Sequence, residues 1–542
     1  MAERVLRIGI VCHGPQLLQW QAECVRELQR VTGVEITLML EMPRPVKERS
    51  ASLYRWWMQR PSRTTALRME GGTTVLDGLP RISTSARPAV DLLQELEPYR
   101  LDILLQFTAG ELPSSLLQLP RSGVWRIHHG DTTGQVEGVP GLWEAIHGSR
   151  STVAKLVRLT EAGGSVLRSG RFPTFPGSID ATAGGVLLCC ALWPAQVCRA
   201  LLAGDADAAA GADAGPIDLT SRQPGNVEML RVLLKQGAGK RLAKASAEST
   251  SEEWNIGVLP HPVGTLLKDE PSLNVRWLPP PAAGQYRSTP FGLVDQGKLN
   301  VLYEKYDRKQ GKGLIGRLRP KKDNNLKRSR TLLESDGSLS YPFIVEQDGG
   351  IHAVPEQVST GRVDLYLLDE DRSSLTFVST LLQEGLYSPT LFQHDGRWWL
   401  FGTLAPLKDA MLYAYHADRL EGPYTAHLLN PIKVDLASAR PAGTPFRDGG
   451  QLWRPARDGS ISPGGRIALN HVTELSPTRF REETVKYIEP LKGPWSHGLH
   501  TVSKVGDITL VDGMRSPTGK TKRPAGNKAS KKRGTKRVRD HQ

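Results

Sequence analysis

Two glutamates stand at the same distance behind two similar turns. Glu304 follows Gly297 by seven residues, and Glu356 follows Gly349 by seven residues. Side chains alternate along a strand with a period of two, so equal offsets predict that both carboxylates lie on equivalent faces of equivalent strands. Paired carboxylates can break a glycosidic bond, one as the acid and the other as the base or nucleophile. The spacing therefore predicts a carbohydrate site with Glu304 and Glu356 as catalytic residues, and for each glutamate a salt bridge between blades is the alternative.

The turns in front of these glutamates belong to a repeat in the second half of the chain. The turn glycines are Gly297, Gly349, Gly396, Gly449 and Gly506. They recur about every fifty residues, which suits one four-stranded propeller blade. An Asp-Gly turn indicates a hairpin, because glycine adopts a positive φ at little cost. Residues 252–514 are therefore predicted to form a five-bladed β-propeller, with an irregular β-sandwich as the alternative.

Matching positions in the later repeats add candidates for substrate binding. Arg454 and Asp458 flank the matching position of the fourth unit, and Asp512 belongs to the fifth. Trp398 follows the third turn and could stack on the face of a sugar ring, or pack inside its blade. We expect these four side chains to surround the two glutamates near the propeller axis.

A resemblance to known proteins is carried by the stretches YPFIVEQDGGIHAVPE, SPTLFQHDGRWWLFGT and ARPAGTPFRDGGQLWRPARD. They resemble the five-bladed propeller of glycoside hydrolase family 43 and, more closely, the N-terminal region of plant glucosamine inositolphosphorylceramide transferases. The similarity extends over roughly residues 252–515. Its motifs contain Glu356 in VPE, Arg440 ahead of Gly443, and His500 in GLHTV. The resemblance implies that Arg440 and His500 also contact the substrate.

Two positions depart from the hydrolase pattern. Thr289 stands where that pattern has the Asp that serves as general base, and Ser388 replaces another Asp. Loss of one member of an acid–base pair commonly lowers a rate by about 10²–10⁴. Hydrolysis by the family mechanism is therefore disfavoured, whereas sugar binding could survive. The transferase domain proper of the plant enzymes has no counterpart in this sequence.

The first 203 residues read as alternating strands and helices. Apolar runs at 7–12, 34–40, 101–107 and 123–127 are typical of strands, and residues 16–31 carry one apolar helical face. This alternation predicts a Rossmann-like α/β domain with a parallel sheet over 1–203. The first loop lacks GxGxxG, so the dinucleotide fingerprint is absent.

A cluster of polar side chains follows the predicted strand at 123–127. His128, His129 and Asp131 form the sequence HHGD, and Arg126 precedes them. Ligands favour the carboxyl ends of parallel strands, and a histidine beside a carboxylate can act as a general base. Arg126 could hold a phosphate or a carboxylate with two hydrogen bonds. We predict catalytic roles for His128 and Asp131, substrate-binding roles for Arg126 and His129, and no metal. Histidines that merely cap the strand are the alternative.

This half of the chain also resembles a known family. The stretches DILLQFTAG, GVWRIH and GLWEAIHG are similar to the formyltransferase fold of methionyl-tRNA and sugar N-formyltransferases. The resemblance places His128 at the family's histidine. Arg126 stands where the family has an Asn, and no Asp occurs between Thr132 and Ile179 for the third catalytic position. The altered motif disfavours formyl-tetrahydrofolate, so the cofactor stays unassigned.

Composition and charge add predictions for the segments outside these two domains and for the chain as a whole. The chain has 542 residues, 39% of them hydrophobic, and a formal net charge of +14. Residues 515–542 hold eleven Lys and Arg against one acid, which predicts a disordered tail that either contacts polyanions or keeps the chain in solution. Residues 204–251 read as a linker with a helix after 226. No apolar run is long enough to predict a membrane span, and five unpaired cysteines favour a cytoplasmic protein with reduced thiols.

Together these features predict a carbohydrate-directed protein of glycan or glycolipid assembly. We expect a transferase that moves a formyl or glycosyl group on a sugar or nucleotide-sugar, while the propeller binds the glycan. One alternative is a non-catalytic carbohydrate-binding scaffold with degenerate formyltransferase and glycosidase sites. Another is an adaptor that binds polyanions through its tail.

Overall fold

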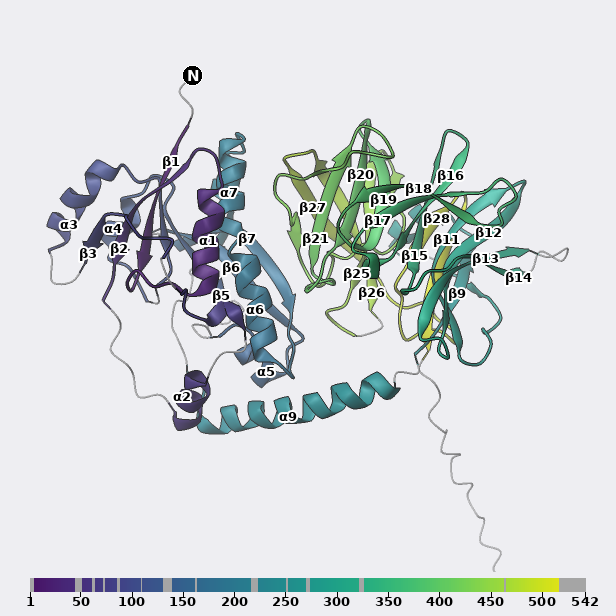
Figure 1. Cartoon of the computed structure of the whole chain (residues 1–542), viewed down its shortest axis with the longest axis horizontal. Helices are drawn as coiled ribbons and strands as arrows, with labels where there is room; N and C mark the ends of the chain where they lie inside the picture. The colour runs from purple at the N-terminus through teal and green to yellow at the C-terminus, as the bar shows by residue number, and fades with distance from the viewer. Residues whose placement is uncertain are drawn as a thin grey trace, which may run out of the picture.

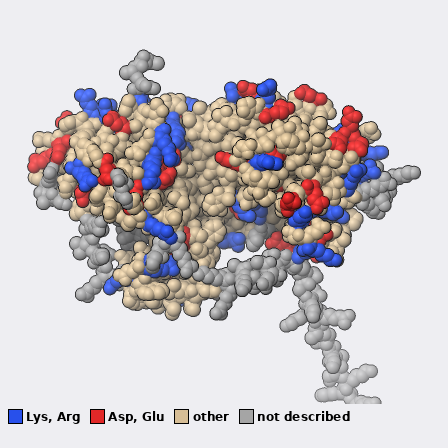
Figure 2. Space-filling view, viewed as in Figure 1, with Lys and Arg blue, Asp and Glu red and all other residues tan. Residues whose placement is uncertain are grey.

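The computed structural model describes residues 4–43, 51–60, 64–71, 74–84, 88–108, 110–129, 139–160, 163–215, 223–249, 252–269, 273–320, 326–462 and 465–515. An α/β half and a β-rich half lie side by side, and a long helix runs beneath both (Figure 1). The predicted basic tail and Asp131 lie outside the described residues, except for Arg515. On the face shown in Figure 2, cationic and anionic side chains are interspersed over both halves.

The first half contains a mixed sheet. Its described strands lie in the order β3-β2-β1-β4-β5-β6-β7-β8. The strands are β1 (Leu6–Cys12), β2 (Val34–Glu41), β3 (Arg81–Ser83), β4 (Ile103–Gln106), β5 (Val124–His129), β6 (Ser151–Thr160), β7 (Gly163–Pro173) and β8 (Ala212–Gly215). The strands from β3 to β5 are parallel, as expected for strands joined through helices, and β6, β7 and β8 extend the sheet in antiparallel fashion.

Helices cover both faces of this sheet. They are α1 (Gln19–Gln29), α2 (Ser52–Gln59), α3 (Ala89–Leu96), α4 (Ser114–Gln118), α5 (Leu142–His147), α6 (Ile179–Cys190), α7 (Trp193–Leu202), α8 (Asp207–Ala210) and α9 (Asn226–Ser249). Residues of α1, α6 and α7 share one core with β1, and residues of α3 and α4 form a second core with β2 and β4 on the other face. Short 3-10 turns occur at Thr65–Leu67, Glu97–Tyr99, Val263–Leu267 and Val358–Thr360.

The most apolar helical stretch is part of the core. Residues Ile179–Leu202 are long and apolar enough to cross a membrane by length and composition, but 72% of their most apolar window is buried inside the protein. The predicted buried thiols are confirmed, because all five cysteines are buried and free of disulfides. Burial raises the pKa of the Cys12 thiol.

The predicted linker is more structured than its composition indicates. Residues Ala212–Gly215 add β8 to the edge of the sheet by pairing with Gly164, Ser165 and Val166. The expected helix is α9, which contacts α2 and α5. Backbone pairing at a free sheet edge needs few apolar side chains, so a small-residue segment such as ADAG can supply it.

The described residues from 253 onward form five sheets, which confirms the predicted five-bladed propeller. The first blade contains β11 (Gln285–Asp295), β12 (Lys298–Asp307), β13 (Lys312–Pro320) and β14 (Leu326–Leu333), and the second contains β15 (Ser340–Gln347), β16 (Gly350–Glu356), β17 (Val363–Leu368) and β18 (Leu375–Leu382). The third contains β19 (Tyr387–His394), β20 (Arg397–Thr403), β21 (Met411–Ala417), β22 (Thr425–Ala426) and β23 (Lys433–Val434). The fourth contains β24 (Phe446–Asp448), β25 (Gln451–Asp458), β26 (Arg466–Leu475) and β27 (Phe480–Ile488). The repeated turns join the first two strands of each of these four blades, and the turn at Gly506 joins β28 (Val502–Val505) and β29 (Ile508–Arg515) of the fifth. In the turn between β19 and β20, Asp395 and Gly396 both adopt positive φ, at 48° and 76°, as a two-residue hairpin turn requires.

The fifth blade closes the ring with strands from both ends of the propeller. It has the order β10 (Arg276–Trp277), β9 (Glu253–Leu259), β29 (Ile508–Arg515) and β28 (Val502–Val505). Strand β29 pairs with β9 in antiparallel register, and the Arg515 guanidinium lies 2.6 Å from the Glu253 carboxylate. Because strands from the beginning and the end of the propeller pair within this blade, their pairing closes the ring of blades.

The two halves are docked through specific hydrogen bonds. The Gln196 amide in α7 donates to the carbonyl oxygens of Leu429, Asn430 and Pro431 at 2.9, 3.1 and 3.4 Å. The Leu436 amide donates to the Arg171 carbonyl at 2.8 Å. The α/β half is therefore held against the third and fourth blades.

Candidate functional site

The innermost strands of three blades carry the same backbone distortion. Thr289, Tyr341 and Ser388 each precede a proline and adopt φ of 48°, 45° and 50°. Each lies at a break in the register between the first two strands of its blade. Positive φ in non-glycine residues costs free energy and persists only where the surroundings enforce it. Three such residues facing one axis indicate a functional centre.

Side chains of neighbouring blades hold these distorted residues. The Thr289 amide donates to Asp512 Oδ2 at 3.1 Å, and the Tyr341 amide donates to Thr289 Oγ1 at 3.1 Å. The Ser388 amide donates to Glu356 Oε2 at 2.7 Å. Each contact joins one blade to the next, so the backbone bends and the blade order stabilise each other.

A cavity of about 290 Å³ opens at this centre. It is lined by Glu252, Trp254, Tyr286, Ser288, Thr289, Glu304, Ser340, Tyr341, Glu356, Ser388, Arg440, Pro441, Arg457, His500 and Thr501. Four residues that the sequence singled out, Glu304, Glu356, Arg440 and His500, therefore meet in one cavity. Its volume is near the lower end for ligand pockets, which suits a single sugar ring better than a long oligosaccharide.

Glu304 is the carboxyl group with the most altered acidity in this cavity. Burial raises the pKa of Glu304 to about 7, and the nearby Glu356 and Asp512 carboxylates add to the rise. Ser288 Oγ donates to Glu304 Oε2 at 2.6 Å, which partly offsets the rise by favouring the anion. Near neutral pH the group can give or accept a proton, as a general acid or base must.

Glu356 is tied to a cation that reaches across the ring. Arg440 Nη2 lies 3.4 Å from Glu356 Oε2, and Arg440 Nη1 lies 2.9 Å from Asp409 Oδ1. Arg440 Nε donates to the Ser388 hydroxyl at 3.0 Å. Burial opposes the charge on Asp409, but Arg440 and Arg457 together hold the pKa of Asp409 below its ordinary value. The arrangement holds Glu356 in the same cavity as Glu304.

The predicted residue Asp512 lies beneath the cavity rather than in its lining. Its Oδ1 atom accepts from the amides of His500 and Thr501 at 2.8 and 2.9 Å. Both carboxylate oxygens are thus engaged by backbone amides, and the side chain is fully buried. Asp512 thus holds the backbone of Thr289 and of His500. The His500 ring lies against Trp254, with ring centroids 3.8 Å apart.

Three other predicted propeller residues do not line the cavity. Arg454 Nε donates to Glu482 at 2.8 Å, and Arg466 Nε donates to Asp458 at 2.9 Å, so both predicted residues are buried in ion pairs. Trp398 is packed in the apolar core of the second and third blades. The repeat placed these three residues on the expected strands of their blades, but their side chains pack inside the blades and do not line the cavity.

Sequence reasoning missed Arg457, Trp254 and Tyr286, which do line the cavity. Arg457 lies next to Ala456, the position that matches the two glutamates, and its amide donates to the Arg440 carbonyl at 2.8 Å. Burial and the neighbouring Arg440 lower the pKa of Arg457 to about 10. The adjacency to Ala456 was the signal that could have identified it.

The N-terminal candidates form a separate group at the end of β5. Burial, together with His128 and Arg126, lowers the pKa of His129 to about 3, so this ring is neutral. The Arg126 guanidinium donates to the Gly110 carbonyl at 2.9 Å, and burial lowers its pKa to about 10. Arg126 is only 5% exposed, which leaves little room for the predicted bidentate contact. His128, His129 and Arg126 do not line the propeller cavity.

The α/β half nevertheless reaches the propeller centre at another point. A second cavity of about 360 Å³ shares Arg440 and Arg457 with the first and also contains Asp409. Its other wall is formed by 148–150 and 173–176, the ends of β6 and β7. The α/β half therefore covers one approach to the propeller cavity. Within the described ranges, no group of three or more His, Cys, Asp or Glu side chains could hold a metal ion.

Comparisons with known proteins concern the propeller half. Residues 281–497 match the family described as glucosamine inositolphosphorylceramide transferase 1, N-terminal. Glucosamine inositolphosphorylceramide transferase 1 of Oryza sativa subsp. japonica is 28% identical over 207 residues, which cover 35% of this chain and 28% of the rice protein. The protein of the same name from Arabidopsis thaliana is 28% identical over 203 residues, which cover 34% of this chain and 26% of that protein. The chain thus spans little more than a quarter of the length of these curated relatives.

Solved structures similar to the chain are glycoside hydrolases. A family 117 enzyme of Zobellia galactanivorans is 13% identical with a TM-score of 0.32 and covers 42% of this chain and 84% of its own. An exo-beta-1,3-galactanase of Phanerochaete chrysosporium is 14% identical with a TM-score of 0.32 and covers 40% of this chain and 54% of its own.

Proposed function

We propose that the propeller cavity binds a sugar ring and that the chain acts as a transferase in the assembly of a glycan or glycolipid. The observation that supports this most directly is the meeting of Glu304, Glu356 and Arg440 in one small cavity with aromatic side chains. Carboxylates and guanidinium groups can hydrogen-bond sugar hydroxyls, and aromatic faces can stack on the ring. The plant relatives are named glucosamine inositolphosphorylceramide transferases, and these names support a transferase in glycolipid assembly.

The proposed chemistry assigns different roles to the two glutamates. Glu304, with its pKa near neutrality, exchanges a proton with a sugar hydroxyl or a leaving oxygen. Glu356, in contact with Arg440, accepts hydrogen bonds from the hydroxyl groups of the sugar ring. Hydrolysis is disfavoured, because Thr289 and Ser388 supply hydroxyls where a carboxylate would activate water. Both hydroxyls already accept hydrogen bonds, from the Tyr341 amide and from Arg440.

The α/β half has a proposed role of its own. By analogy with the formyltransferases, His128 at the end of β5 would act on the amine or hydroxyl of an activated sugar, with His129 next to it in β5. Asp131, the other predicted catalytic residue, lies outside the described residues. The neutral His129 and the backbone-bonded Arg126 favour a positioning role for these two residues. The alternative is a carbohydrate-binding scaffold in which neither centre turns over. For the whole chain we also propose a cytoplasmic setting, supported by the five unpaired cysteines.

Calorimetric titration of the full-length protein tests the sugar site. The probes are glucosamine, N-acetylglucosamine, myo-inositol and UDP-N-acetylglucosamine, applied to wild type, Glu304→Gln and Glu356→Gln. The matched control is Glu346→Gln, because Glu346 is exposed on the same blade as Glu356. Saturable binding that both cavity variants lose and the control keeps supports the proposal. Binding that survives both cavity substitutions, or no binding of any probe, contradicts it.

A turnover assay distinguishes the proposed transferase from the non-catalytic carbohydrate-binding scaffold. Wild type, His128→Ala and Glu356→Ala are incubated with UDP-N-acetylglucosamine and myo-inositol as the glycosyl acceptor, or with formyl-tetrahydrofolate and glucosamine as the amine acceptor, and the products are identified by mass spectrometry. Product formation that depends on either residue supports a transferase. Sugar binding without product in any combination supports the scaffold.

A further inference from the structure

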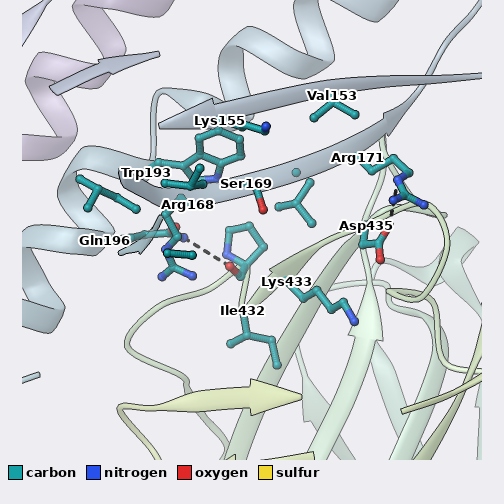
Figure 3. A pocket seen from close by; sticks show the side chains of 16 residues that line it. Val153, Lys155, Arg168, Ser169, Arg171, Trp193, Gln196, Ile432, Lys433 and Asp435 are labelled. Atoms are coloured by element: carbon teal, nitrogen blue, oxygen red, sulfur yellow. Dashed lines mark hydrogen bonds and ion pairs between the residues drawn. The ribbon is translucent and has the colours of Figure 1, made fainter. Parts of the chain in front are cut away.

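A third cavity lies between the two halves, away from both candidate centres. Its volume is about 490 Å³, within the usual range for small-molecule pockets. Figure 3 shows residues of β6, β7 and α7 on one side and the propeller residues Ile432, Lys433 and Asp435 on the other. The cavity therefore exists only where the α/β half and the third blade are docked together.

The cavity coincides with an interrupted sheet edge. Strand β7 pairs with β8 up to Val166, and Arg171 forms an isolated bridge with Asp435 of the propeller. Among the described residues, no strand pairs with this edge of β7 between these two points, and residues 167–170 line the cavity there. An unpaired strand edge presents backbone N–H and C=O groups to whatever occupies the space.

Cations predominate in the lining. Lys155, Arg168, Arg171 and Lys433 face a single lining carboxylate, Asp435. Within the part of the chain that the structure describes, the side chains of Lys155 and Arg168 have no hydrogen bond or ion pair. Burial lowers the pKa of Arg168, which means that its charge has lost solvent without gaining a contacting anion.

The neighbouring carboxylates are already engaged by other cations. Asp435 lies 3.9 Å from Arg171, and Glu482 lies 2.7 Å from Lys433. Asp205, the acid whose charge acts on Arg168, lies 3.6 Å from Arg481. A desolvated guanidinium is costly unless an anion contacts it. Lys155 pairs with Ser169 and Arg168 pairs with Leu156, so these two cations lie on opposite faces of the hairpin. The unpaired Arg168 guanidinium therefore indicates a bound anion on its own face of β7.

The uncharged part of the lining defines the rest of the ligand. The Trp193 ring, Ile432 and Val434 form apolar walls beside the cations. We propose that this interdomain cavity binds a small organic phosphate, with the phosphate on Arg168 and its organic portion against Trp193, which lies on the same face of β7. Guanidinium and ammonium groups are the usual partners of phosphate oxygens. This site does not depend on sugar binding in the propeller cavity.

Binding to the full-length protein tests the proposal directly. The probes are inorganic phosphate, glucose 1-phosphate, uridine diphosphate, and phosphatidylcholine vesicles with and without phosphatidylinositol. We expect at least one phosphate ester to bind, and Arg168→Gln to weaken that binding about tenfold or more through loss of a charge-assisted hydrogen bond. The matched control is Arg121→Gln, whose exposed side chain does not line the cavity. Preference for the soluble esters or for the vesicles shows whether the phosphate comes from a metabolite or a lipid headgroup.

Hydrogen exchange locates the bound phosphate and separates this cavity from the basic tail. Bound ligand should slow exchange at 167–170 and at 431–435 together. Arg168→Gln should also unfold at the same or a higher denaturant concentration than wild type without ligand, because it removes an uncompensated charge. The proposal is overturned if no probe binds, if Arg168→Gln binds as tightly as the control, or if protection appears only outside these two segments.

Discussion

Arg440, in the segment before β24, contacts Glu356 at the end of β16, with Nη2 3.4 Å from Oε2. The contact joins the fourth blade to the second across the propeller centre. The same guanidinium contacts Asp409 and the Ser388 hydroxyl, so one side chain orders three blades around the cavity. A residue in this position serves both the stability of the ring and the charge of the site.

Replacement of Arg440 should therefore affect folding and binding together. Arg440→Gln leaves Glu356 and Asp409 without their cation, and loss of one partner of a largely buried pair costs about 3 kcal/mol. Denaturant unfolding of the full-length protein should show this loss in the propeller transition. Arg447→Gln is the control, since its ion pair with Asp395 is exposed and should contribute less than about 1 kcal/mol. Equal stability of the two variants would contradict a central role for Arg440.

Glu304 should make stability depend on pH in a defined direction. Its pKa is raised to about 7 in the folded protein by burial, so the folded state binds the proton more tightly than the unfolded state. Its contribution is fully present below the unfolded pKa of about 4.5 and is lost as pH rises through about 7. Glu304→Gln cannot titrate, so its unfolding free energy should fall less than that of wild type between about pH 5 and pH 7.5. The check is denaturant unfolding at several pH values, and parallel profiles for the two proteins would refute the assignment.

The sequence was most informative where local chemistry decides the structure. The hairpin turns follow from Asp-Gly pairs such as Asp395 and Gly396, whose positive φ depends on residue type alone. The meeting of Glu304 and Glu356 follows from equal offsets in equivalent strands. Both features need only the period of a strand and the repeat of a blade.

Features that depend on partners distant in the chain could not be predicted in this way. Arg454 flanks the position of its repeat that matches the two glutamates, but its guanidinium donates to Glu482, 28 residues later, inside the blade. Arg457 lines the cavity because the backbone of Arg440 holds it there. The hairpin of β6 and β7 escaped prediction because β7 lacks a regular alternation of buried and exposed residues: its first six residues are all half-buried.

Gly443 should be the least replaceable glycine of the propeller. It has φ of 132°, and a Cβ atom there would overlap the Val502 carbonyl, while its amide donates to Tyr341 Oη at 2.8 Å. Gly443→Ala should push the fifth blade away from the centre and destabilise the propeller by several kcal/mol, at the high end for single substitutions. Gly396→Asn is the control, because that turn has open space around it and Asn tolerates positive φ. Thermal unfolding of both variants compares them, and a Gly443→Ala protein as stable as the control would exclude this close contact.

Gln196 should control how firmly the two halves are docked. Its buried amide donates to three consecutive carbonyl groups of the propeller. Gln196→Leu preserves bulk but leaves those carbonyls without their donor, at a cost of about 1–3 kcal/mol. Hydrogen exchange at 429–436 and at β7 should accelerate, because the cost falls on docking rather than on either core. Gln29→Leu supplies the control, since Gln29 makes one exposed bond to the Val75 carbonyl. If exchange at the interface is unchanged in Gln196→Leu, the apolar contacts around Gly185 and Leu407 must hold the halves together by themselves.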